Sequence, residues 1–234
     1  NSFSDYILRK VENDSLSYMV EKLSGNMLKK SVYLGNKIKN GAVKDAAIKN
    51  AAYFAVSLLI FGDELPDELP PEARELAQKE YALVKSMNGY ERSFLFPYMI
   101  NYQKLKPAAH YADTTACSRY YAAMGWYSQS SFPLFNGNGE KLRNTSQTLQ
   151  ALLITYCLFL DSDGSRDFDL WRCIYDAAAL KGGGADDLDV FDYKSLLVKV
   201  YGQNPNLEEL DSDKNLDRLY REAQELPSPE GEAE

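Results

Sequence analysis

The sequence has 234 residues, of which 45% are hydrophobic and 26% are charged, so the chain can bury a substantial core and is not a disordered protein. Its formal net charge of -8 is unevenly divided, because residues 1–160 carry 18 basic and 15 acidic side chains whereas residues 161–234 carry 8 and 19. This balance argues against a nucleic acid as partner, since phosphate binding needs a concentrated Lys and Arg surface.

Apolar residues recur every three to four positions in the first half of the chain, which is the period of an amphipathic helix. The segment 42–61 is rich in alanine and nearly apolar all round, which is typical of a helix that other elements surround. Asp14 or Ser15 can break the first helix, and Gly62 ends the alanine-rich one. The helices predicted here cover residues 3–23, 26–38, 42–61 and 72–87.

The second half of the chain continues the helical pattern, and no stretch alternates like a strand. Residues 88–109 are expected to be irregular, and Asn136-Gly137-Asn138-Gly139 to form a loop. The predicted helices cover residues 114–128, 146–160, a segment through Trp171 and Tyr175, 189–202 and 213–226. We therefore expect a single all-α domain over residues 1–226, with about seven to ten helices in an irregular array or partial toroid, followed by an acidic tail over residues 227–234.

Several functions are excluded by what the sequence lacks. The longest apolar runs, residues 51–61 and 151–160, are shorter than the about 20 residues that span a bilayer. The three cysteines are too widely spaced for a thiolate zinc site. The chain has no phosphate-binding glycine loop, dinucleotide fingerprint, serine-hydrolase elbow or zinc-protease motif. We expect no cofactor and no metal.

The only histidine, His110, lies in the densest aromatic stretch of the chain. A structural role for His110 is favoured over catalysis, because no partner for proton transfer stands near it in sequence. The tyrosines around it carry hydroxyls that need water or a hydrogen-bond partner, so part of this cluster is a candidate polar-aromatic groove. The candidate binding residues of this groove are Tyr102, His110, Tyr111, Arg119 and Trp126.

Asp186 and Asp187 follow Gly183-Gly184, and glycine lets a backbone approach a ligand closely. Two adjacent acids can position a hydroxyl, a cation or a proton. Adjacent acids near a helix start are more often caps. Asp186 and Asp187 are therefore candidate binding or acid-base residues, and helix capping is the alternative interpretation.

Three segments in the same order resemble a bacterial family known as domain of unknown function 3160. They are Asn101 to Tyr111, Arg119 to Trp126, and Trp171-Arg-Cys-Ile-Tyr175 followed by Gly184-Ala-Asp-Asp-Leu188. Ala108 and Gln129 stand where the family pattern has arginine. The resemblance implies no biochemical activity, but it implies a protein that is exported or lipid-anchored, and hence an extracellular or cell-envelope location.

Three functions stay open from the sequence. The leading hypothesis is a non-catalytic binding module of the bacterial cell envelope or exterior, with a glycan or a peptide as ligand. The second is a hydrolase acting on a saccharide or peptide, with Asp186 and Asp187 or His110 as acid and base. The third is a helical scaffold whose acidic C-terminal half meets a basic protein partner.

Overall fold

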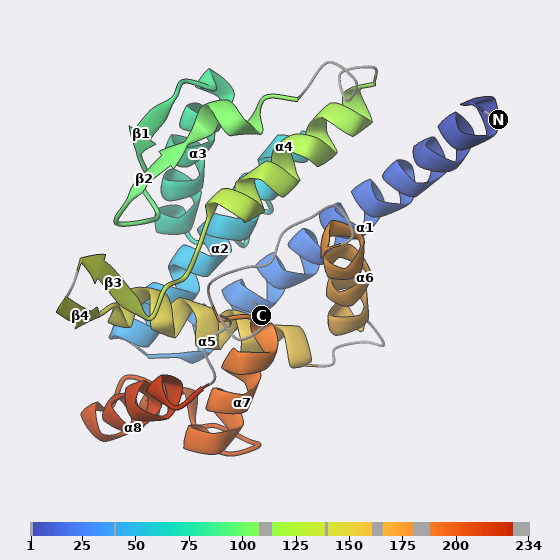
Figure 1. Cartoon of the computed structure of the whole chain (residues 1–234). Helices are drawn as coiled ribbons and strands as arrows, with labels where there is room; N and C mark the ends of the chain where they lie inside the picture. Colours follow the sequence, from blue (N-terminus) through green and yellow to red (C-terminus); the bar gives the residue numbers. More distant parts are fainter. Residues whose placement is uncertain are drawn as a thin grey trace.

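A computed structural model describes residues 2–39, 41–107, 114–138, 140–160, 166–179 and 188–226, with the backbone alone for residues 2–13, 136–138, 140–141 and 178–179. The predicted all-α fold is confirmed, because 71% of the structure is helical and its described part contains eight α-helices (Figure 1). The helices are α1 (Ser2–Lys37), α2 (Ala42–Phe61), α3 (Pro71–Ser86), α4 (Thr115–Gln129), α5 (Thr145–Phe159), α6 (Asp167–Ala179), α7 (Val190–Tyr201) and α8 (Asp213–Gln224).

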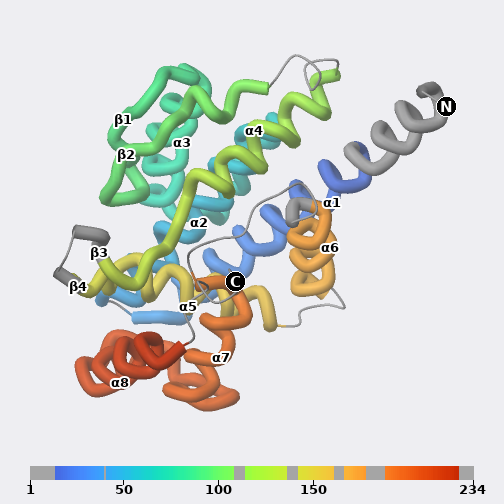
Figure 2. The backbone as a smooth tube through the Cα atoms, in the orientation of Figure 1, coloured from blue at the N-terminus to red at the C-terminus, as the bar shows by residue number. Residues whose placement is uncertain are grey.

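Helix α2 lies at the centre of the array and packs against α1, α3, α4 and α5 (Figures 1 and 2). Small side chains such as Ala52 and Ala55 are completely buried, which lets the neighbouring helices approach closely. Gly62 ends the helix in the left-handed conformation (φ 88°), where a residue without a Cβ is favoured. The backbone N–H of Asp63 then donates to the carbonyl of Leu58 at 3.0 Å, and this bond fixes the start of the following loop.

Helix α1 is a single helix of 36 residues, so the predicted break at Asp14 or Ser15 and the separate helix over residues 26–38 were wrong. Asp14 and Ser15 are exposed on the surface of the continuous helix. Their capping preference is worth about 1 kcal/mol, and the packing of the rest of α1 along α2 outweighs it.

Two short antiparallel hairpins interrupt the helices, whereas no strand was expected. The strands are β1 (Tyr90–Arg92) with β2 (Met99–Asn101), and β3 (Phe135–Asn138) with β4 (Glu140–Arg143). Strands of three or four residues are too short to show an alternating pattern. The Asn-Gly pairs predicted as a loop are also a hairpin signal, and the second hairpin forms there.

The remaining predicted helices are confirmed to within a few residues. Thr114 caps α4 by accepting a hydrogen bond from the backbone N–H of Cys117. Asp189 and Asp192 form a capping box at the start of α7. The predicted acidic tail, residues 227–234, lies outside the described residues.

Helix α6 is joined to α1 by a buried ion pair. The ammonium group of Lys30 lies 2.7 Å from the carboxylate of Asp167, and their side chains are 7% and 0% exposed. Lys30 also donates to the backbone carbonyls of Cys157 and Leu160, and Asn26 donates to Asp167 at 2.7 Å. Each charged group therefore has hydrogen-bond partners that offset its loss of water.

Among the helices in the described part of the chain, none combines the length and the apolar character that crossing a bilayer requires.

Candidate functional site

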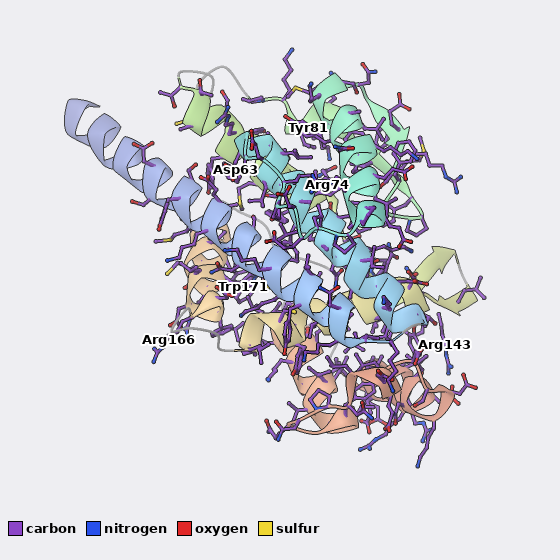
Figure 3. All side chains as sticks on the ribbon, turned by 180° about the vertical axis from the view of Figure 1, so that it is seen from behind. Asp63, Arg74, Tyr81, Arg143, Arg166 and Trp171 are labelled. Carbon is purple, nitrogen blue, oxygen red and sulfur yellow. The ribbon has the colours of Figure 1, made fainter. Side chains whose placement is uncertain are left out.

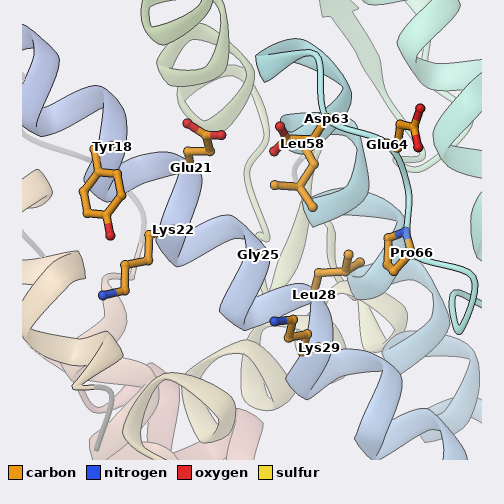
Figure 4. A pocket seen from close by; sticks show the side chains of 10 residues that line it. All are labelled: Tyr18, Glu21, Lys22, Gly25, Leu28, Lys29, Leu58, Asp63, Glu64 and Pro66. Carbon is orange, nitrogen blue, oxygen red and sulfur yellow. The ribbon is translucent and has the colours of Figure 1, made fainter.

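A pocket of about 590 Å³ runs along one face of α1 and reaches the end of α2 (Figure 4). Its apolar floor consists of Leu28, Leu58 and Pro66. Small-molecule sites are commonly concave and of this size, with a few polar groups placed on apolar walls. The volume and the lining therefore make this pocket the candidate binding site.

The α1 side of the pocket is a stripe of residues at helical spacing. Tyr18, Lys22, Gly25 and Lys29 recur every three or four positions, so they share one face of α1. Nothing lies within 4 Å of the position that a Cβ of Gly25 would take. Glycine inside a helix costs about 1 kcal/mol relative to alanine, and packing does not require it here. Its effect is to open the pocket down to the helix backbone.

Two carboxyl groups from different elements meet at one end of the pocket. Glu21 belongs to α1 (Figure 4), and Asp63 follows the last turn of α2 (Figures 3 and 4). Burial raises the pKa of Glu21 above its usual range, and the negative charge of Asp63 and a hydrogen bond between the two carboxyls raise it further. Glu21 therefore keeps its proton to a higher pH than an isolated glutamate would.

Arg119 of α4 supplies a positive charge beside this pair, and its charge opposes the rise in the Glu21 pKa. Its guanidinium group lies against the backbone of Gly62, where a Cβ would come within 2.7 Å of the Nη2 atom. Any side chain at position 62 would push the guanidinium group away and strain a positive φ angle. Gly62 thus ends α2 and leaves room for Arg119.

The charges around the pocket are balanced overall. The acidic groups are Glu21, Asp63 and Glu64, and the basic groups are Lys22, Lys29 and Arg119. The arrangement can accept hydrogen bonds or hold a cation at the carboxyl pair, and it can attract an anion at Lys29. It can also donate a proton from the pair.

The predicted site residues fall in different places. Arg119 lies near the Glu21–Asp63 pair and acts on the charge of Glu21, although it is not one of the residues that line the pocket. Tyr102 and Trp126 are 0% exposed, so neither lines a groove in this structure. The hydroxyl of Tyr102 donates to Glu80, and the indole N–H of Trp126 donates to the carbonyl of Tyr53 at 3.2 Å. These contacts give both aromatic rings a structural role, and the ligand contact predicted for them stays a prediction.

The other predicted site residues, His110, Tyr111, Asp186 and Asp187, lie outside the described residues.

Sequence reasoning missed Glu21, Gly25 and Asp63. The stripe on α1 could have been found from its spacing, but a predicted helix boundary between residues 23 and 26 placed Gly25 outside any helix. The pairing of Glu21 with Asp63 depends on how α1 packs against the end of α2, and no pattern within either segment reports that packing.

The fold and the pocket define an all-α protein that carries a site of mixed charge along its first helix. The chain belongs to the family described as protein of unknown function (DUF3160), whose family model matches residues 2–233. The resemblance noted in the sequence is thereby confirmed over nearly the whole chain. Neither a curated protein nor a solved structure matches the chain.

Proposed function

We propose that this protein is a non-catalytic binding module of the bacterial cell envelope or exterior, and that the pocket on α1 holds its ligand, a glycan or a peptide. The observation that carries the proposal is an open pocket with charged groups of both signs around an apolar floor. A few polar groups on apolar walls orient a ligand, and the concave surface leaves room for one. The open space beside Gly25 also supports this proposal.

Ligand screening tests this proposal. Thermal-shift and NMR titrations with oligosaccharides and short peptides should stabilise the wild-type protein and perturb resonances of α1 and of the end of α2. Glu21→Gln and Asp63→Asn should lose about tenfold or more in affinity, because each removes a charged hydrogen-bond partner. Glu72→Gln, an exposed change in the first turn of α3 away from the pocket, is the matched control. Silence with every ligand would contradict the proposal.

One observation favours a second function, a hydrolase that acts on a saccharide or peptide. A general acid must keep its proton near the working pH, and the raised pKa of Glu21 beside Asp63 brings a carboxyl group toward that condition. Turnover of a bound ligand that Glu21→Gln abolishes, while binding persists, would favour this alternative over the binding module. The acids predicted from the sequence, Asp186 and Asp187, and the base His110 remain candidates for the same chemistry.

A further inference from the structure

The pocket has two ends of opposite charge. The carboxyl groups of Glu21 and Asp63 lie at one end, and the ammonium group of Lys29 lies toward the other (Figure 4). Lys22 lies over the ring of Tyr18, 5.8 Å from its centroid, which leaves Lys29 as the more available ammonium on this face. A ligand that complements both ends carries a cation and an anion at its two extremities.

The separation of these ends sets the length of the ligand. Glu21 and Lys29 are eight residues apart on α1, which corresponds to about 12 Å along the helix axis. Three amino acids in extended conformation span about 10 Å, and the lysine side chain can reach across the remainder. Gly25 lies halfway between the two ends, so a ligand that joins them crosses the open space above it.

We propose that the pocket binds a short peptide of about three residues, with its N-terminal ammonium group at the Glu21–Asp63 pair and its C-terminal carboxylate at Lys29. This inference rests on the proposed binding function and specifies the ligand of the same site. Leu28, Leu58 and Pro66 would contact the middle of the peptide. Because apolar contacts select little by sequence, the charged termini and the length are the recognised features.

The proton of Glu21 gives the binding a pH dependence. With one proton bound, Glu21, Asp63 and Arg119 together carry no net charge, and loss of that proton leaves one negative charge. A bound ammonium group stabilises this deprotonated form, so peptide binding releases a proton. The affinity therefore rises with pH through the titration of Glu21, whose pKa is raised by burial and by Asp63 and lowered by Arg119.

Calorimetry with four probes tests the inference. The probes are trialanine, its N-acetylated form, its C-amidated form and the neutral trisaccharide maltotriose. Trialanine should bind, and each blocked form should lose about tenfold or more in affinity because it lacks one charge-assisted contact. At a pH within the titration of Glu21, calorimetry in two buffers of different ionisation enthalpy should show proton release for trialanine. Equal affinity for trialanine and its N-acetylated form would overturn the inference.

A pair of glycine variants separates binding from folding. Gly25→Ala and Gly35→Ala both place a methyl group inside α1, where alanine is favoured by about 1 kcal/mol. At Gly35 the methyl group would meet Ala47 at an ordinary contact distance of 3.8 Å, whereas at Gly25 it would enter the pocket. Both variants should unfold at a higher temperature than the wild type, and only Gly25→Ala should weaken trialanine binding. Unchanged binding by Gly25→Ala would contradict a peptide that crosses this position.

The outcomes also distinguish the two proposals. Binding of maltotriose, but not of trialanine, that Gly25→Ala weakens would overturn the peptide inference and support the binding module. No binding of any ligand at this pocket would overturn both.

Discussion

Trp126 joins several parts of the core through one side chain. Its ring lies 5.6 Å from that of Tyr53 and 6.0 Å from that of Phe96, and its N–H donates to a backbone carbonyl of α2. Such a residue loses both packing and a hydrogen bond when it is truncated. Any effect of Trp126 on ligand binding must therefore be measured separately from its effect on folding.

Trp126→Ala should lower the free energy of unfolding by about 3–5 kcal/mol, which is the usual cost of removing a large buried aromatic side chain. Chemical denaturation checks this value. Trp171→Ala is the matched control, because Trp171 on α6 is only partly buried, and its loss should be smaller. Equal losses for the two variants would contradict the position of Trp126 in the core.

Glu80 is a buried carboxyl group that secures the first hairpin to α3. Its side chain is 0% exposed and accepts hydrogen bonds from Ser93 at 3.0 Å, from the backbone N–H of Phe94 at 2.7 Å and from Tyr102. Burial raises its pKa, and these hydrogen bonds oppose the rise without cancelling it.

The stability of the protein should therefore depend on pH through Glu80. Between the unfolded pKa, near 4.5, and the raised folded pKa, the folded state binds more protons than the unfolded state. This contribution to stability is present below pH 4.5 and is lost as the pH rises through the folded pKa. Urea denaturation at a series of pH values should show the decline in the wild type and a shallower one in Glu80→Gln. Identical slopes would show that Glu80 does not titrate in this way.

At the scale of elements, the buried pair between Lys30 and Asp167 determines how α6 is attached to α1. A long apolar contact would allow α6 to slide or rotate, whereas two directional charged groups define one position. The pair thus contributes to the position of α6 more than to the net stability of the fold.

Lys30→Met should destabilise the fold by about 3–5 kcal/mol, because it leaves the Asp167 carboxylate buried without its cation. Lys30→Met combined with Asp167→Leu should recover a large part of this loss. Lys79→Met, which breaks the exposed pair with Glu75, is the control and should change little. Thermal unfolding followed by circular dichroism measures all three, and a double variant that is less stable than Lys30→Met would contradict the argument.

The elements that the sequence predicted best are those with strong local signals. Helix α2 was predicted at its observed bounds, because its apolar composition and Gly62 act within the same segment. The helix predicted over residues 189–202 likewise matches α7, which begins just after its N-cap residue Asp189. The continuity of α1 could not be predicted, since the residues that stabilise it against a break lie on α2.

For the molecule as a whole, the fold class and the family followed from the sequence, whereas the pocket did not. Arg119 was predicted as a binding residue and lies beside the carboxyl pair, but its neighbours Glu21 and Asp63 come from segments 42 positions apart in the chain. These residues lie close together because of how the helices pack. A periodic pattern in the sequence predicts which face of a helix is buried, but not which residues of another helix it will meet.

Apart from Arg119, the groups that form the candidate site belong to residues 18–66, which is the antiparallel pair α1 and α2 with the start of the next loop. The recognition surface is therefore local in the chain, although the core that supports it is not. Substitutions in the distant helices would alter ligand affinity only by tilting this pair. Hydrogen exchange on the ligand-bound protein should accordingly show the largest slowing of amide exchange within one contiguous stretch, residues 18–66.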